Sequence, residues 1–292
     1  MPELQNTLNS WHRAFAEFLR ELFVPLNLAI FPELPVIGKP PQVDIMFFKR
    51  EPAVWTEPQL ERLPDGIRQC KATYIMLEFK YTESVNEDAF VQARTYDYLY
   101  KRHQQLTDRE VQTFIVSSRK PRQNTREKWG YDTEVYQGVY HSSDKFLKNI
   151  PLISLNELAR ERHNAYFKLF SSHKVERENA FKMLEREGLP LLSEPLESLL
   201  SGLRLIEGEQ EMKELTPKEV LEMGRKWGKR YLSMLPPEDL AGIPLEKRLA
   251  GIPPSERLAG IPPEERLAGL TLPEVLSQFK PKEIRAYLRN IK

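Results

Sequence analysis

The sequence predicts an α/β fold in which a mixed central β-sheet is flanked by helices and is followed by an α-helical, repeat-containing tail. Three observations support this class. An amphipathic helix precedes two strand candidates, a second helix and a further strand. Residues 71–81 are rich in the aromatic and branched side chains that strands favour. A nearly exact nine-residue repeat runs from Pro236 to Leu270.

The composition is that of a globular protein with a hydrophobic core. Of 292 residues, 40% are hydrophobic and 29% are charged, and the formal net charge is +1, so any basic surface must be local. The single cysteine, Cys70, excludes an intrachain disulfide and a CxxC metal pair. The N-terminus lacks the layout of a signal peptide, and no apolar run has the ~20 residues that span a bilayer. We therefore expect a cytoplasmic protein that does not enter a membrane.

The first half of the chain supplies most of the predicted sheet. An amphipathic helix covers residues 6–23 and ends before Pro25. A polar excursion over residues 49–70 separates the first two strands, and a helix over residues 87–103 begins at Ser84 or Asn86 as N-cap. The three strands expected here lie at residues 42–48, 71–81 and 111–117.

The second half of the chain has a weaker pattern. We expect a basic loop, two short strands, a helix that Gly188 and Pro190 stop, and two further helices, at residues 119–128, 134–140, 152–155, 156–187, 216–234 and 273–290. Three regions follow: a sheet domain, a helical linker, and the repeats with a last helix, at residues 1–190, 191–235 and 236–292.

Two carboxylates and a lysine fall on predicted strands. Side chains alternate along a strand, so Glu78 and Lys80 share one face while Phe79 points to an apolar layer. Asp44 lies in the neighbouring strand candidate. Buried charges of this kind need compensation, which a divalent metal provides.

Magnesium, or manganese in its place, is the metal expected at this site. It prefers hard oxygen ligands, and Asp44, Glu78 and the backbone carbonyl of Phe79 offer three. Lys80 would then hold or activate a water and offset charge at an attacked phosphate. This set of groups is sufficient for phosphodiester hydrolysis.

At this point the chain resembles the PD-(D/E)XK nuclease superfamily. The resemblance depends on Asp44, on Glu78-x-Lys80 about thirty residues later, and on Gln92 and Tyr96, which match a QxxxY extension. The run LISLNELARERHNAYFKLFSS and the LAGIPPEERLAGL repeats also resemble a recombination-promoting nuclease and transposase-like group of bacteria. Residue 43 is Val where the family motif has Pro, and this proline supplies no ligand.

The resemblance implies a restriction-endonuclease-like core and a magnesium-dependent endodeoxyribonuclease, linked to recombination or mobile elements. Gln92 would orient a ligand or phosphate, and Tyr96 would support the site by hydrogen bonding. An acidic residue of the first helix would join them, and Glu17 fits the family spacing better than Glu21. The family also leaves a homodimer open.

A basic loop offers contacts to DNA. Lysine and arginine attract backbone phosphates regardless of sequence. The alternative is a solvated loop without a ligand. The residues concerned are Arg119, Lys120, Arg122, Arg126 and Lys128.

Each feature also has an interpretation without catalysis. Asp44 would accept backbone hydrogen bonds at a strand edge, Glu78 and Lys80 would be a solvated strand face, and Gln92 and Tyr96 a polar helix face. Two further functional classes stay open. One is a nucleic-acid-binding module on the same fold without turnover, and the other is a protein-interaction module in which the repeat tail binds a partner.

Overall fold

The computed structural model describes residues 10–31, 45–50, 54–82, 84–187, 190, 192–234 and 271–290. The chain divides into two compact units, Met1–Tyr231 and Leu232–Lys292. The repeats at residues 236–270 lie outside the described residues.

The first unit contains a seven-stranded mixed sheet. Its strands are β1 (Leu28–Phe31), β2 (Ile45–Arg50), β3 (Tyr74–Lys80), β4 (Val111–Ser117), β5 (Thr133–Tyr136), β6 (Val139–His141) and β7 (Leu152–Ser154). They lie in the order β1-β2-β3-β4-β7-β6-β5. The β3–β4 and β4–β7 pairs are parallel, and the other neighbours pair antiparallel. The predicted α/β class with a mixed sheet flanked by helices is therefore confirmed.

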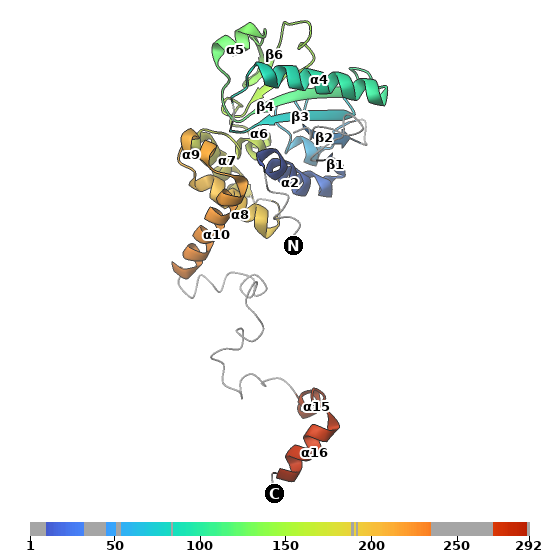
Figure 1. Ribbon diagram of the computed structural model, residues 1–292, viewed down its shortest axis with the longest axis vertical. Helices are drawn as coiled ribbons and strands as arrows, with labels where there is room; N and C mark the ends of the chain where they lie inside the picture. The colour runs from blue at the N-terminus through green and yellow to red at the C-terminus, as the bar shows by residue number, and fades with distance from the viewer. Residues whose placement is uncertain are drawn as a thin grey trace. The chain divides into compact units, whose positions relative to one another are not determined.

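Helices cover both faces of this sheet (Figure 1). The helices of the first unit are α2 (Trp11–Phe23), a 3-10 turn η1 (Val24–Leu26), α3 (Glu57–Leu60), α4 (Glu87–Gln104), α5 (Gln123–Lys128), α6 (Arg162–Lys168), α7 (Lys174–Glu187), α8 (Glu194–Leu205), α9 (Glu209–Glu214) and α10 (Pro217–Met234), whose last residues pass into the second unit. None of the helices in the described part of the chain has the length and apolar character needed to cross a bilayer.

The two faces of β3 differ in chemistry. On one face Phe79 stacks on Phe15 of α2 with ring centroids 4.2 Å apart, inside an aromatic core that also includes Phe170. On the other face Met76 packs with Tyr100 of α4. The predicted alternation along this strand is confirmed, since Leu77 and Phe79 lie in the core beneath α2.

Several predicted boundaries are also confirmed. Asn86, not Ser84, caps α4, because its side chain accepts a hydrogen bond from the Ala89 amide at 3.0 Å. The helix predicted at residues 216–234 matches α10. The strand predicted at residues 42–48 ends two residues later than expected, since β2 continues to Arg50, and of its predicted residues only 45–48 are described.

The strand predicted at residues 134–140 is wrong, because the chain turns there into the hairpin of β5 and β6. Gly138 has a φ of +77°, a conformation that side chains rarely adopt. A Cβ at this position would also collide with the backbone of Glu157 and Leu158. The turn therefore depends on glycine, and the run on both sides of it cannot form one strand.

The single helix predicted over residues 156–187 is also wrong. The structure has two helices, α6 and α7, separated by residues 169–173. In this break the Ser172 amide donates to the Ser118 carbonyl at 3.0 Å, and the His173 amide donates to the Asn156 side chain at 3.0 Å. These amides bind the sheet end instead of continuing a helix.

Two smaller corrections concern loops and the last helix. The predicted basic loop contains the six-residue helix α5. In the second unit the predicted last helix is two helices, α15 (Leu272–Leu276) and α16 (Pro281–Asn290), and Thr271 and Glu274 form a capping box at the first.

The helices after residue 190 contribute to the core of the first unit. Leu199 and Leu203 of α8, and Val220 of α10, are fully buried in the same cluster as Phe15. Gly202 lets α8 approach the backbone of α10 closely, since a Cβ there would clash with the Val220 carbonyl. The region expected to be a linker therefore packs against the sheet domain, up to Tyr231.

Candidate active site

A buried ion pair lies at the carboxyl end of β3. Glu78 has no exposed surface, and its carboxylate lies 2.7 Å from the amine of Lys80, whose side chain is 14% exposed. Both residues face α4, as the alternation predicted. The interpretation as a solvated strand face is wrong for Glu78, because its side chain has no exposed surface. Burying a carboxylate is costly and requires a compensating charge.

The pair continues into a polar network on α4. The Lys80 amine donates to the Gln92 side-chain oxygen at 3.3 Å, and the Gln92 amide donates to the Tyr96 hydroxyl at 3.2 Å. Gln92 and Tyr96 are one turn apart on the helix, so both reach the same place. Four of the predicted site residues therefore form one connected chain of contacts.

Of the remaining predicted acids, the two on α2 make their described contacts outside this chain of contacts. Asp44 lies outside the described residues, directly before Ile45, which is the register partner of Glu78. Glu17 is nearly buried on α2 and pairs with Arg20 at 2.9 Å. Glu21 accepts a hydrogen bond from the Ser193 amide at 2.6 Å, which gives it a role in holding the segment before α8.

The described residues contain no complete set of side-chain metal ligands. Among them no three His, Cys, Asp or Glu side chains converge as a metal site would require. Glu78 is therefore not part of a three-residue cluster of this kind in the described part of the chain. The ligand set expected from the sequence also includes Asp44, which lies outside the described residues.

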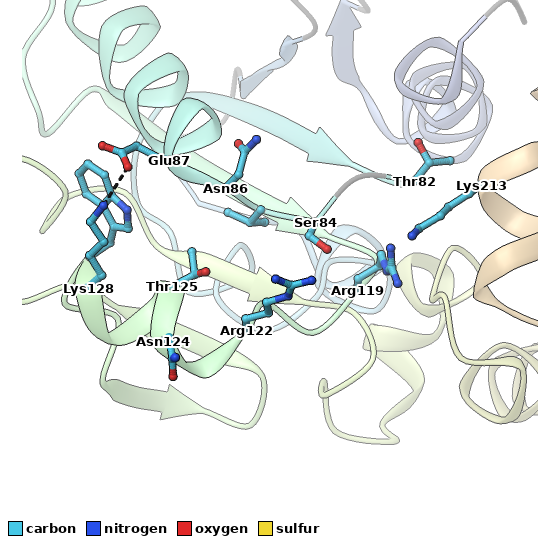
Figure 2. A pocket seen from close by; sticks show the side chains of 12 residues that line it. Thr82, Ser84, Asn86, Glu87, Arg119, Arg122, Asn124, Thr125, Lys128 and Lys213 are labelled. Atoms are coloured by element: carbon cyan, nitrogen blue, oxygen red, sulfur yellow. Dashed lines mark hydrogen bonds and ion pairs between the residues drawn. The ribbon is translucent and has the colours of Figure 1, made fainter.

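A basic cleft opens beside the carboxyl ends of β3 and β4 (Figure 2). Its cavity has a volume of ≈ 830 Å³. Three of the predicted DNA-contacting residues line it, namely Arg119, Arg122 and Lys128. Lys128 pairs there with Glu87 at 2.8 Å, and Glu87 is the one acidic side chain among the described residues of the lining.

The other two basic residues of the predicted loop make contacts elsewhere. The Lys120 amine lies 2.6 Å from the Glu157 carboxylate. The Arg126 guanidinium lies over the ring of Tyr140, 4.4 Å from its centroid. The structure therefore gathers three of the five residues at one surface.

A second, smaller cavity of ≈ 370 Å³ reaches Lys80 itself. Trp11, Phe79 and Tyr81 contribute to its wall. Burial raises the pKa of the Tyr81 hydroxyl well above its usual range, against the opposing charge of Arg177, so this phenol stays neutral.

One charged residue at these cavities was not predicted from the sequence. Lys213, on α9, lines both cavities, and so does Thr82, which follows β3. A lone lysine in a charged segment far along the chain carries no sequence signal. Only the packing of the helices after residue 190 brings it to the sheet.

Comparisons with known proteins add no relative: no family model, no curated protein and no solved structure matches this chain.

Proposed function

We propose that the first unit is a metal-dependent nuclease that hydrolyses phosphodiester bonds of DNA, on a restriction-endonuclease-like core. The observation that supports this most is the contact chain from buried Glu78 through Lys80 to Gln92 and Tyr96. Lys80 joins this network to a cavity open to a substrate. A purely structural ion pair has no need of such an opening.

The donor chemistry fits a hard divalent cation such as magnesium, with manganese as substitute. The carboxylates of Asp44 and Glu78 and the carbonyl of Phe79 would hold it. Once bound, it supplies a nucleophilic water at neutral pH and stabilises negative charge on the attacked phosphate.

The protein's own side chains position the reaction. Lys80 carries its positive charge to the cavity wall, where it orients a water and attracts a phosphate oxygen. Gln92 and Tyr96 fix the direction of the Lys80 amine, because Gln92 accepts a hydrogen bond from Lys80 and Tyr96 accepts one from Gln92. The basic cleft supplies contacts to neighbouring phosphates.

The proposal makes one structural demand on the start of β2. Phe48 faces α2, since it packs on Phe23, and Glu78 faces α4. Strict alternation from Phe48 assigns residue 44 to the α2 face. The proposed site therefore requires an interruption just before Ile45, of the kind that a β-bulge makes.

Plasmid cleavage by the full chain tests this function. The assay compares magnesium, manganese and chelator, with Asp44→Ala and Lys80→Ala beside the wild type. The proposal predicts cleavage that chelator abolishes and that both variants lose. DNA binding without cleavage by the wild type would point to a binding module, and tail-dependent protein binding with neither activity would point to an interaction module.

A double substitution tests the demand on β2. If Asp44 and Glu78 hold one ion, Asp44→Asn combined with Glu78→Gln cleaves no more slowly than either single variant, because residues that act as a unit are not additive. If the losses of cleavage rate in the two single variants multiply in the double variant, Asp44 and Glu78 do not hold one ion.

A further inference from the structure

Lys213 stands where the two cavities meet. It lines the basic cleft together with Arg119 and Arg122, and it lines the smaller cavity together with Lys80. Thr82 is also common to both. In Figure 2 Lys213 extends from its helix toward Arg119, near Thr82. The two cavities therefore share a border that carries a positive charge.

In the part of the chain that the structure describes, the charges along this path are unbalanced. The described lining of the basic cleft carries four cationic side chains, Arg119, Arg122, Lys128 and Lys213, and one carboxylate, Glu87. Glu87 is paired with Lys128. Among the residues that the structure describes, no carboxylate pairs with Lys213 or Arg122. An excess of cations over carboxylates in a cleft creates a positive potential that attracts an anion.

The arrangement favours a phosphodiester backbone over a single small anion. The cations lie at successive positions along the cleft, and hydroxyl and amide donors of Thr82, Ser84 and Asn86 lie among them. Lysine and arginine contacts to phosphates hold a strand in register without reading its bases.

We infer that Lys213 of α9 binds a backbone phosphate of a DNA strand that runs from the Lys80 cavity into the basic cleft, and that the contact is independent of base sequence. This inference rests on the proposed function in taking DNA as the ligand. It assigns to the helical region after residue 190 a direct part in substrate binding. Arg119 and Arg122 contact the phosphates that follow along the strand.

The test measures binding separately from cleavage. The full chain is titrated in chelator against two labelled single-stranded DNA oligonucleotides of equal length and unrelated sequence, over a series of salt concentrations. The variants are Lys213→Ala, Lys213→Arg and the control Lys218→Ala, which removes an equal charge from an exposed position of α10 that lines neither cavity. Thermal melts confirm that all variants are folded.

The inference predicts that Lys213→Ala weakens binding several-fold for both sequences. Its slope of log affinity against log salt should be shallower by about 0.7, the value for one lost phosphate contact on a single strand. Lys213→Arg should retain the affinity, and Lys218→Ala should match the wild type in slope.

Equal effects of Lys213→Ala and Lys218→Ala would overturn the inference, as would a loss confined to one sequence. The two proposals fail separately. A specific loss of binding in Lys213→Ala supports the inference even if no cleavage is found. If the wild type cleaves DNA and Lys213→Ala binds DNA as the wild type does, the inference is overturned and the proposed nuclease function is retained.

Discussion

Two buried carboxylates lie between the sheet and α4, and they are held in different ways. Glu78 and Asp97 both have no exposed surface, and each lies 2.7 Å from a lysine. Asp97 also accepts hydrogen bonds from Arg94 and Thr113, both at 2.8 Å. It is therefore a satisfied acceptor that ties α4 to β4.

The lysines of the two pairs lead in different directions. Lys101 also pairs with a second carboxylate, Asp108, at 2.7 Å, so its positive charge lies between two acidic side chains. Lys80 donates a hydrogen bond to Gln92 and lines a cavity. Two ion pairs with the same separation therefore differ in what their lysines contact, and under the proposed function this difference separates a stabilising pair from a chemical one.

The largest expected effect is the loss of Asp97. Asp97→Ala leaves the Lys101 charge and two further donors without their buried acceptor, and this should cost about 3–5 kcal/mol of unfolding free energy. Denaturant titration measures it. Asp88→Ala, at an exposed position of the same helix, is the control and should cost no more than about 1 kcal/mol. A similar loss in both variants would remove the structural role of Asp97.

Matched amide substitutions should separate the two pairs next. Asp97→Asn should cost about 1–3 kcal/mol of unfolding free energy. The new amide N–H group would face the donors that now bond to the carboxylate, so a buried donor would lose its acceptor. Glu78→Gln should change stability by less than about 1 kcal/mol, since it removes the desolvation cost and Lys80 can reach water in its cavity. Equal losses in denaturant titrations would erase the distinction.

A smaller effect is expected at Tyr96. Tyr96→Phe removes the hydroxyl that accepts a hydrogen bond from Gln92. One hydrogen bond of about 0.5–1.5 kcal/mol corresponds to a roughly two- to tenfold slower cleavage rate. Tyr98→Phe, at an exposed tyrosine of α4, should cleave like the wild type. An unchanged cleavage rate in Tyr96→Phe would show that the Tyr96 hydroxyl does not contribute to the reaction.

The smallest effect concerns Asp108 and pH. The hydrogen bond from Lys101, together with nearby positive charge, lowers the pKa of Asp108 below its usual value of 3.8. Its stabilisation is present above that value and is lost as the pH falls through the lower folded-state pKa. Because the side chain is 61% exposed, Asp108→Asn should cost less than about 1 kcal/mol near neutral pH. The difference from the wild type should vanish in acid, and a persistent one would contradict the assignment.

The sequence predicted those parts of the site that depend on local periodicity. Alternation along β3 placed Glu78 and Lys80 on one face and Phe79 on the other. Helical spacing placed Gln92 and Tyr96 together, and the Asn86 cap set the start of α4. Each of these features is fixed within a few residues of chain.

Features that depend on distant contacts were not predictable in this way. The break between α6 and α7 arises because the Ser172 amide binds Ser118, more than fifty residues earlier. The turn at Gly138 is confined by the backbone of Leu158. Lys213 reaches the cleft only because α8 and α10 pack into the core. Such contacts are set by tertiary packing, which local patterns do not encode.

The central claim is that Glu78 contributes to the cleavage reaction, whereas Asp97 contributes to the stability of the fold. The most direct measurement compares magnesium-dependent cleavage rates of Glu78→Gln and Asp97→Asn, each corrected for its folded fraction. The account predicts a rate lower by about 100-fold or more for Glu78→Gln, since metal and oxyanion stabilisation supply effects of that size. It predicts a rate within about threefold of the wild type for Asp97→Asn, because a structural group acts on stability instead of the barrier. A Glu78→Gln variant that cleaves as fast as Asp97→Asn would contradict it.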